Sequence, residues 1–396
     1  MNSAHEALSG WWERPDFARF LADLMRAELA RLRPDLNLHP AAWTEATSFL
    51  DGALKLDSLD RLRLASAVAT ALNVTSAPIP DRLREAGTFG EWLSDARRIA
   101  AQAGAVAFKS SGSGGAPVSV VHQTADLGQE IAVLADLFAT RRRVVASVSA
   151  HHIYGFLFTV LLPHVLGCEV LDARRASPAA LGAVLRAGDL LVAFPTVWEA
   201  AAEGGVRWPD DVIGVSSGAH CRSGLARELA QAGLREWVEI YGSTETGGIG
   251  WRTLGDAPFR LFGFWSRLDD DHLVKGAGTY LLPDVVTWTD PAHLVPSARR
   301  DRAVQVGGIN VYPSRARAVL MAHAGVADAA VRLMRMEEGE RLKAFIVPRE
   351  PAVDRHRLQE SLIDWVEARL AAAERPRSFT FGASVPIAAS GKPADW

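Results

Sequence analysis

Short β-branched runs alternate with Ala- and Leu-rich stretches along the middle of this chain, and this alternation constrains the fold most strongly. The runs with strand character are Val144–Val148, Leu190–Phe194, Val212–Val215 and Trp237–Ile240. Pro178–Arg186 and Gly224–Ala232 lie between them and are typical of helices. Strands that alternate with helices predict an α/β domain. Because small polar or glycine-rich residues follow several of the runs, we expect a ligand site at the strand ends.

The first hundred residues have a different pattern, in which apolar positions recur at helical spacing. Phe17 and Phe20 belong to one such face, behind Asp16, which we predict to be the N-cap. A second helix is predicted over 59–72, and no stretch of this segment is typical of a strand. The segment therefore indicates a mainly helical domain.

A third pattern begins near Arg299, with a helix, a strand and another helix predicted in succession. These elements cover Ser314–Ala322, Ala344–Val347 and His356–Ala372. A chain of 396 residues accommodates two or three domains. We expect three: a helical domain over 1–99, a large α/β domain over 100–298 and a small α+β domain over 299–396.

Composition excludes several classes of protein. Hydrophobic residues make up 48% and charged residues 22%, values typical of a folded protein with a large core. A net charge of -3 disfavours nucleic-acid partners. The two cysteines, Cys168 and Cys221, lack the spacing of a disulfide framework or a zinc site. The chain shows neither a signal peptide nor a membrane-spanning run, so we expect a cytoplasmic protein that does not interact with membranes.

The first candidate for chemistry is a loop between two strand-like stretches, Ala105–Lys109 and Val118–His122. Its residues are Ser110, Ser111, Gly112, Ser113, Gly114 and Gly115. Glycines allow the backbone to turn several N–H groups toward one anion, and serine hydroxyls add donors, which suits a phosphate chain. By composition alone, a flexible linker explains the loop as well.

The second candidate follows the strand that ends at Ile240. It contains Tyr241, Gly242, Ser243, Thr244, Glu245, Thr246, Gly247 and Gly248. An aromatic face for a base, a hydroxyl for a phosphate and a carboxylate for Mg²⁺ stand within five positions and suit a nucleotide. A polar turn without a ligand uses the same residue types.

The third candidate is Lys392, which lies within Ser390-Gly391-Lys392 close to the last residue, Trp396. A lysine on a turn of small residues is a mobile positive charge that can neutralise a developing oxyanion. Most lysines near a terminus are only solvated.

These motifs, in this order, resemble the adenylate-forming ligase superfamily of acyl-CoA synthetases and nonribosomal adenylation domains. The resemblance covers residues 104–396 and includes Asp284 and Arg299-Arg300-Asp301 between the second and third motifs. It implies a large α/β nucleotide-binding domain and a small, mobile α+β domain. It also implies ATP as a substrate and Mg²⁺ as a cofactor.

The resemblance assigns expected roles around the nucleotide. The loop that begins at Ser110 resembles the one that holds the ATP phosphates, but Gly114 and Val118 stand where the family has threonine and lysine. This departure leaves most of the phosphate contacts to backbone N–H groups. Tyr241 resembles the adenine-stacking aromatic residue, with Gly242 and Ser243 beside it.

Further roles follow from the same resemblance. Thr244 corresponds to the residue that touches the α-phosphate, and Glu245 to the Mg²⁺ carboxylate. Asp284 stands in the place of the ribose-binding aspartate, without its usual Thr-Gly, and Arg299 in that of the ribose or phosphate arginine. Asp301 resembles the hinge of the small domain, and Lys392 the lysine that bridges carboxylate and α-phosphate.

The acid-binding pocket is expected around His152, which resembles the gate residue of the family, and Tyr154 beside it. Phe194, Trp198 and Ser217 fall where relatives line this pocket, and Gly218 and Ala219 extend the set toward the nucleotide. Aromatic walls favour a flat aryl acid, whereas core packing explains a buried His, Phe or Trp equally well. The charged run Arg141–Arg143 is interpreted as solvated surface, with CoA or carrier contact as the alternative.

The segment 17–98 resembles an acyl carrier protein, because Asp57-Ser58-Leu59 matches the motif whose serine carries 4'-phosphopantetheine. Ser58 is therefore a candidate attachment site. Asp57 or Ser58 serves equally well as the N-cap of the helix that follows, which requires no modification.

The resemblance is strongest to short ligases of aryl-polyene and xanthomonadin-type pigment pathways, which load hydroxybenzoate onto an acyl carrier protein. It implies ATP-dependent activation of a small aromatic carboxylic acid, release of pyrophosphate and transfer to a carrier thiol. An aryl-CoA ligase that uses free CoA is the nearest alternative. A non-catalytic protein that docks carriers is the alternative from another class, favoured by the missing loop lysine.

Overall fold

The structure is a computed structural model that describes residues 8–33, 43–52, 54–74, 81–110, 118–253, 255–301, 303–307, 309–335, 338–339, 341–350, 352–386 and 396. Contacts within the chain divide it into two compact units. The large unit comprises the described residues up to Ser110, Val118–Leu282 and Val286–Pro296. The small unit comprises Pro283–Val285 and the described residues from Ser297 onward.

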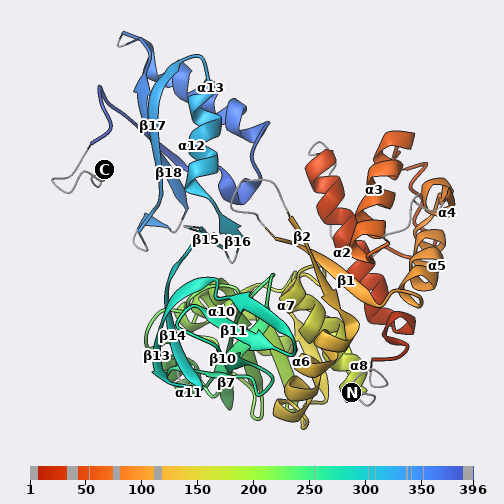
Figure 1. Ribbon diagram of the computed structural model, residues 1–396. Helices are drawn as coiled ribbons and strands as arrows, with labels where there is room; N and C mark the ends of the chain where they lie inside the picture. The colour runs from red at the N-terminus through yellow and green to blue at the C-terminus, as the bar shows by residue number, and fades with distance from the viewer. Residues whose placement is uncertain are drawn as a thin grey trace. The chain divides into compact units, whose positions relative to one another are not determined.

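Helices of the large unit fall into an N-terminal group and a group around the sheet (Figure 1). The N-terminal group is η1 (Trp11–Glu13), α2 (Pro15–Leu32), α3 (Ser58–Ala71), α4 (Asp81–Glu85) and α5 (Phe89–Ala100). The second group is α6 (Thr124–Leu137), α7 (Ile153–Phe156), the π-helix η2 (Leu157–Leu161), α8 (Leu162–Leu166), α9 (Pro178–Val184), α10 (Pro195–Glu203) and α11 (Leu225–Gln231).

A nine-stranded sheet organises the large unit, in the order β13-β14-β9-β8-β7-β6-β5-β3-β4. Its strands are β3 (Arg143–Ala146), β4 (Glu169–Asp172), β5 (Asp189–Ala193), β6 (Ile213–Ser217), β7 (Glu236–Ser243), β8 (Gly247–Arg252), β9 (Phe259–Leu261), β13 (Asp284–Asp290) and β14 (His293–Arg299). The strands β4, β3, β5, β6 and β7 run parallel, as is usual where strands alternate with helices. Every residue of β5 is buried, because helices cover both faces of a parallel sheet.

Two smaller sheets complete this unit. One is the antiparallel hairpin of β1 (Ala105–Ser110) and β2 (Val118–Gln123). The other joins β10 (Ser266–Arg267), β11 (His272–Lys275) and β12 (Gly278–Leu281).

The N-terminal helices share one hydrophobic core with the parallel sheet. The Phe20 ring lies 5.0 Å from that of Phe156, measured between centroids, and Trp11 contacts Phe156 at 5.2 Å. In Figure 1, α2, α3 and α5 lie side by side next to the hairpin β1–β2. Burial of large aromatic side chains between these elements makes the helices part of the large unit.

Two predicted helix caps have different outcomes. Asp16 lies inside α2, so the prediction that it is the N-cap is wrong: the cap is Arg14, and Pro15 occupies the first turn, where its fixed φ suits a helix start. Asp57 caps α3, since its carboxylate accepts a hydrogen bond from the Asp60 N–H at 2.8 Å. This confirms one of the two caps proposed there, and Ser58 is left exposed in the first turn.

The small unit contains a three-stranded sheet with helices packed on it, an α+β arrangement as predicted (Figure 1). The sheet has the order β17-β18-β19, formed by Val326–Leu333, Leu342–Pro348 and Ser378–Phe381. The helices are α12 (Pro313–Met321), α13 (Arg355–Glu367) and η4 (Ala372–Glu374), and a hairpin joins β15 (Val304–Val306) to β16 (Ile309–Val311). Its own core includes Leu320, Ile346 and Leu362.

We expect Phe20→Ala to lower the free energy of unfolding of the large unit by about 3–5 kcal/mol, because the side chain is 1% exposed and its removal leaves a cavity against Phe156. Denaturant unfolding followed by tryptophan fluorescence measures the change. Phe20→Leu, which fills most of the cavity, is the control and costs less. If Phe20→Ala left the unfolding of the sheet unchanged and unfolded only residues 1–99, the conclusion that the helices and the sheet share one core would be wrong.

Candidate active site

The carboxyl ends of β6 and β7 bring two predicted motifs together. The strands pair in parallel, with Ser217 opposite Ile240, and the Ser217 hydroxyl donates to the Ile240 carbonyl at 2.8 Å. Gly218 follows β6 with a φ of 90°, in the left-handed region that glycine adopts freely. Ser217, Gly218 and the segment that begins at Tyr241 therefore lie at one edge of the sheet, as expected for an open α/β fold.

The segment after Ile240 continues as strand for longer than the sequence predicts. β7 runs to Ser243, because Tyr241 pairs with Gly250 and Ser243 with Gly247 in the antiparallel strand β8. A register irregularity separates Tyr241 from Gly242. Tyr241 is 8% exposed and its ring packs against Phe259 with centroids 5.5 Å apart, and its stacking on a base stays a prediction.

Residues 243–248 form a turn that holds itself by side-chain hydrogen bonds. The Ser243 hydroxyl accepts from the N–H groups of Glu245 at 3.2 Å and Thr246 at 3.3 Å. The Thr246 hydroxyl accepts from the Ser243 N–H at 3.2 Å and donates to the Gly247 carbonyl at 2.8 Å. We call this segment the 243–248 turn.

Glu245 takes part in the hydrogen bonds of the 243–248 turn only through its backbone N–H, and its side chain is exposed. An exposed carboxylate provides the hard oxygen ligands that Mg²⁺ prefers, so the residue present fits the expected metal. The Thr244 side chain beside it is half-buried. Among the residues that the structure describes, His, Cys, Asp and Glu side chains do not gather in threes as a metal-binding cluster.

His122 on β2 binds the turn from one side. Its Nε2 donates to the Thr244 carbonyl at 2.7 Å. Burial lowers the pKa of His122, although its hydrogen bond to Thr244 acts in the opposite direction. The ring is therefore neutral at pH 7 with the proton on Nε2.

Glu130 on α6 binds the turn at its other end. The carboxylate oxygens lie 3.0 and 3.1 Å from the Gly248 N–H, which donates to them, and Glu130 is 3% exposed. The Trp265 indole N–H donates to the Gly248 carbonyl at 2.7 Å, so the backbone N–H and the carbonyl of Gly248 both have hydrogen-bond partners. Burial raises the pKa of Glu130 to about 7, against the lowering effects of the Gly248 N–H and of the Lys275 charge.

Lys275 is a second buried charge in this region. It is 8% exposed on β11, and its ammonium lies 4.9 Å from the ring centroid of Trp265 and 5.6 Å from those of Phe264 and Tyr280. Aromatic faces stabilise a desolvated cation. Sequence analysis identified neither Glu130 nor Lys275, since a Glu within a helix and a Lys within a strand carry no motif.

The predicted acid-pocket residues differ in exposure. His152 precedes α7 and keeps an accessible side chain, while desolvation by the surrounding protein lowers its pKa. The Tyr154 hydroxyl donates to the carbonyls of Ala193 at 3.2 Å and Val215 at 3.0 Å, which ties α7 to the ends of β5 and β6. Phe194 contacts the Tyr154 ring at 5.9 Å. The pocket itself stays a prediction for these residues.

Trp198 has a structural role in the large unit. It is fully buried in the core cluster on one side of the sheet, and its indole N–H donates to the Val215 carbonyl at 3.2 Å. Core packing therefore accounts for this residue without a ligand. Ala219, in the loop after β6, is half-buried.

The N-terminal helix α2 also supports the loop before His152, which sequence reasoning missed. Asp23 accepts a hydrogen bond from the Ala150 N–H at 2.8 Å. Arg174 donates to the other Asp23 oxygen at 2.7 Å. A buried carboxylate needs such partners, and here they fix the backbone two residues before His152.

In the small unit, Arg299 and Asp301 form a bidentate ion pair with N–O distances of 2.9 and 2.7 Å. The Tyr312 hydroxyl donates to Asp301 at 2.9 Å, and the Ala303 N–H donates at 3.0 Å. Partial burial alone raises the pKa of Asp301, but these hydrogen bonds outweigh it and lower the pKa to about 2. Asp284 lies close by, since its carbonyl accepts from Arg300 at 3.2 Å.

Several predicted residues lie outside the described part of the chain. They are Ser111, Gly112, Ser113, Gly114, Gly115 and Lys392. Ser110 ends β1 and is buried. The roles of Ser110 and of the six residues outside the described part stay predictions from the sequence.

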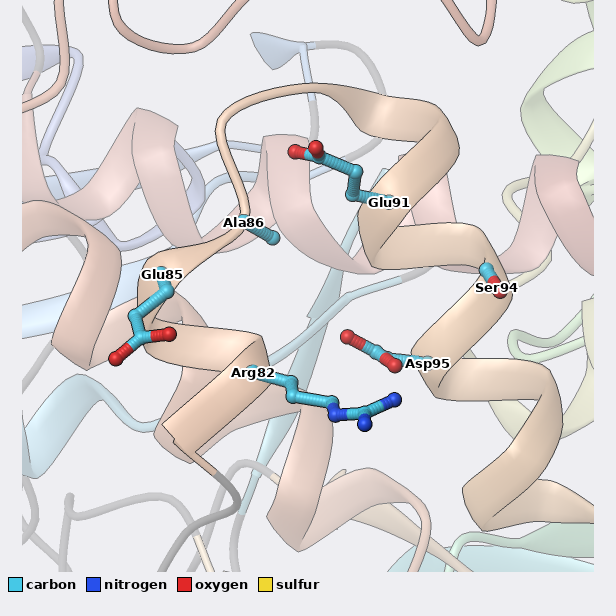
Figure 2. A pocket seen from close by; sticks show the side chains of 6 residues that line it. All are labelled: Arg82, Glu85, Ala86, Glu91, Ser94 and Asp95. Atoms are coloured by element: carbon cyan, nitrogen blue, oxygen red, sulfur yellow. The ribbon is translucent and has the colours of Figure 1, made fainter.

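A hollow on the large unit lies between α4 and α5, and none of the described candidate residues lines it (Figure 2). Arg82 and Glu85 line it from α4, and Glu91, Ser94 and Asp95 line it from α5. Glu91 is already used in the capping box of α5, where it accepts from the Thr88 N–H at 3.0 Å.

In the described ranges, no helix has the length and apolar character needed to cross a bilayer.

Comparison with known proteins gives a consistent picture. The sequence model of the AMP-binding enzyme family matches residues 44–283, and that of the AMP-binding enzyme C-terminal domain matches residues 318–392. A 4-coumarate–CoA ligase from Rhodobacter capsulatus is 36% identical over 388 residues, which cover 96% of this chain and 99% of the relative. A 4-coumarate–CoA ligase from Halorhodospira halophila is 36% identical over 388 residues, covering 94% and 97%.

The fold is also found among solved structures. An o-succinylbenzoate CoA synthetase from Bacillus subtilis, bound to a product analogue, superposes with a TM-score of 0.60 at 18% identity. The match covers 76% of this chain and 72% of that one. At this identity the likeness shows the shared two-part fold and not a shared substrate.

We expect the stability of the wild-type protein to fall relative to Glu130→Gln as the pH rises from 5 to 8. The pKa of Glu130 in the folded state is about 7, above the value of an unfolded chain, so its stabilising contribution is complete only below the unfolded pKa. It is lost as the pH rises through 7, and the shift corresponds to about 3 kcal/mol. Denaturant unfolding of both proteins at several pH values measures this difference, and a constant difference across the range would contradict it.

Proposed function

This chain belongs to the family of AMP-binding enzymes, and on that premise we propose that it joins a hydroxylated aromatic carboxylic acid to the thiol of CoA. The enzyme is an acid–thiol ligase that converts ATP to AMP and pyrophosphate. The observation that carries the choice of acid and thiol is the full-length likeness to two ligases named for 4-coumarate and CoA.

The first reaction makes a good leaving group. A carboxylate oxygen of the acid attacks the α-phosphate of ATP, the bond to the β-phosphate breaks, and acyl-AMP and pyrophosphate form. In the second reaction the CoA sulfur attacks the acyl carbon, AMP leaves, and the thiol proton is released. Two anions meet in the first step, so positive charge must offset their repulsion.

We assign the nucleotide to the edge of the sheet where β6 and β7 end. Thr244 would contact the α-phosphate there, and Glu245 would hold Mg²⁺ through its exposed carboxylate. Bound Mg²⁺ would neutralise phosphate charge. The hydrogen bonds within the 243–248 turn orient Thr244 and Glu245 before the substrate arrives.

The acid is proposed to be 4-hydroxycinnamic, with hydroxybenzoic acids as the alternatives that the sequence resemblance favours. The names of the full-length relatives support the first choice. Phe194 and the residues near His152 suit a flat aromatic ring of either kind.

CoA is proposed as the acceptor in place of the acyl carrier protein that the sequence resemblance favours, and with it a role in pigment formation loses its main support. The family match begins at residue 44 and includes Ser58, which supports the ligase as the context of this segment. Asp57 already provides the cap of α3, so the Asp-Ser-Leu motif has a use without phosphopantetheine. Attachment of phosphopantetheine at Ser58 stays a prediction.

A carrier-docking protein without activity is the alternative from another class. The missing loop lysine favours it. Both parts of the family match argue against it, and so does the retention of Thr244, Glu245, Arg299, Asp301 and Lys392 together.

We expect ATP–pyrophosphate exchange with 4-coumarate and, in the complete reaction, the CoA thioester as product. Exchange assays with 4-coumarate and a panel of hydroxybenzoates rank the acids by kcat/KM. A parallel assay offers CoA and a phosphopantetheinylated acyl carrier protein as acceptors. Silence with every acid would favour the docking protein, and faster transfer to the carrier would contradict CoA as the acceptor.

We expect Lys392→Ala to reduce adenylate formation by at least about 100-fold, because one stabilising charge is lost in the transition state. Transfer to CoA from supplied acyl-adenylate should stay within about threefold of the wild type. Single-turnover assays separate the two steps. Lys343→Ala, a lysine of β18 paired with Glu338, is the control for a lost charge in the small unit. Equal loss of both steps in Lys392→Ala would contradict its assigned role.

A further inference from the structure

The 243–248 turn is attached to the rest of the large unit at two points. Thr244 is bound through its carbonyl by His122, and Gly248 through its N–H by Glu130. Glu245, the proposed Mg²⁺ ligand, lies between these two points. The two attachments come from different elements, β2 and α6, so neither is part of the turn's own hydrogen bonding.

The contact between Glu130 and the turn is close. A side chain at Gly247 would be strained, because the φ of this residue is 71° and a Cβ there would lie 2.7 Å from a Glu130 carboxylate oxygen, which would have to move. A Cβ on Gly248 would collide with the same carboxylate. The two glycines thus allow the backbone of the turn to approach the carboxylate in its present position.

A carboxylate is an expensive choice for this position. Glu130 is 3% exposed, and a buried acid costs stability unless its partners compensate. The Gly248 N–H and the charge of Lys275 compensate in part, yet burial still dominates. A residue that served packing alone would avoid this cost, which points to a use in holding the turn.

We propose that Glu130 is a positioning residue that fixes the 243–248 turn so that Thr244 and Glu245 meet the nucleotide in one orientation. Glu130 does not touch the nucleotide in this proposal, and it acts through Glu245. The proposal rests on the proposed function. Reacting groups must be held closely, and a displacement of about 1 Å can cost about 100-fold in rate.

The test uses the full chain and the substitutions Glu130→Leu and Glu130→Gln. Leucine removes the acceptor, and glutamine keeps an oxygen that accepts from the Gly248 N–H. The expected result is a fall in kcat/KM for MgATP of about 30–100-fold in Glu130→Leu and of less than about fivefold in Glu130→Gln. Asp189→Asn is the matched control, since Asp189 is 1% exposed and pairs with Arg143 at the start of β5.

A double-mutant cycle with Glu245→Gln separates positioning from a general loss of structure. If Glu130 acts through Glu245, Glu130→Leu should lower kcat/KM by less than about threefold further once Glu245 is replaced. Independent, additive losses, or a loss in Glu130→Leu no larger than in Asp189→Asn, would overturn the proposal. If Glu130→Leu does not fold, Trp265→Phe replaces it in the cycle, because it removes the hydrogen bond to the Gly248 carbonyl, and the same two outcomes apply.

Calorimetry with MgATP alone distinguishes this proposal from the proposed function. A wild-type protein that binds MgATP but exchanges pyrophosphate with none of the acids refutes the function, while weaker binding in Glu130→Leu than in Glu130→Gln still supports positioning. If the wild type and both variants bind MgATP equally and exchange pyrophosphate equally, the positioning role of Glu130 is refuted and the proposed function is not. A wild-type protein that does not bind MgATP refutes both.

Discussion

The parallel pairing of β6 with β7 is the constraint on which the site depends. It places the end of β6 beside the end of β7, and the Ser217 hydroxyl donates a hydrogen bond to the Ile240 carbonyl there. Segments more than twenty positions apart in sequence thereby become neighbours. The buried strands on one side and the antiparallel strand β8 on the other hold this edge, so the candidate site residues are presented from a scaffold and not from a free loop.

Three buried or partly buried side chains of the large unit bind backbone groups near the predicted site residues. Glu130 and His122 bind the backbone of the 243–248 turn, and Asp23 binds the loop before His152. Each of these side chains satisfies a backbone group that would otherwise be left without a partner in a low-dielectric environment. Substitution of any of them leaves such a group unsatisfied, so stability and site geometry are linked at these positions.

The N-terminal helices belong to the same argument. Their aromatic residues pack on Phe156, which lies two positions after Tyr154 and four after His152, both predicted acid-pocket residues. Helix α2 also supplies Asp23. The small unit has a comparable centre of its own, where Asp301 accepts from Arg299, Tyr312 and the Ala303 N–H, and the residue predicted as the hinge is thus firmly held.

The sequence by itself determined the α/β alternation and the small α+β unit, because hydrophobic periodicity is a local property that survives into the fold. Thr244 and Glu245 could be proposed as site residues from the sequence, because their chemistry is concentrated in a short segment. Tertiary structure alone decided that β7 extends to Ser243, since its partner β8 supplies the pairing. It alone also revealed Glu130 and Lys275, whose burial and whose proximity to the turn depend on the packing of elements that are distant in sequence.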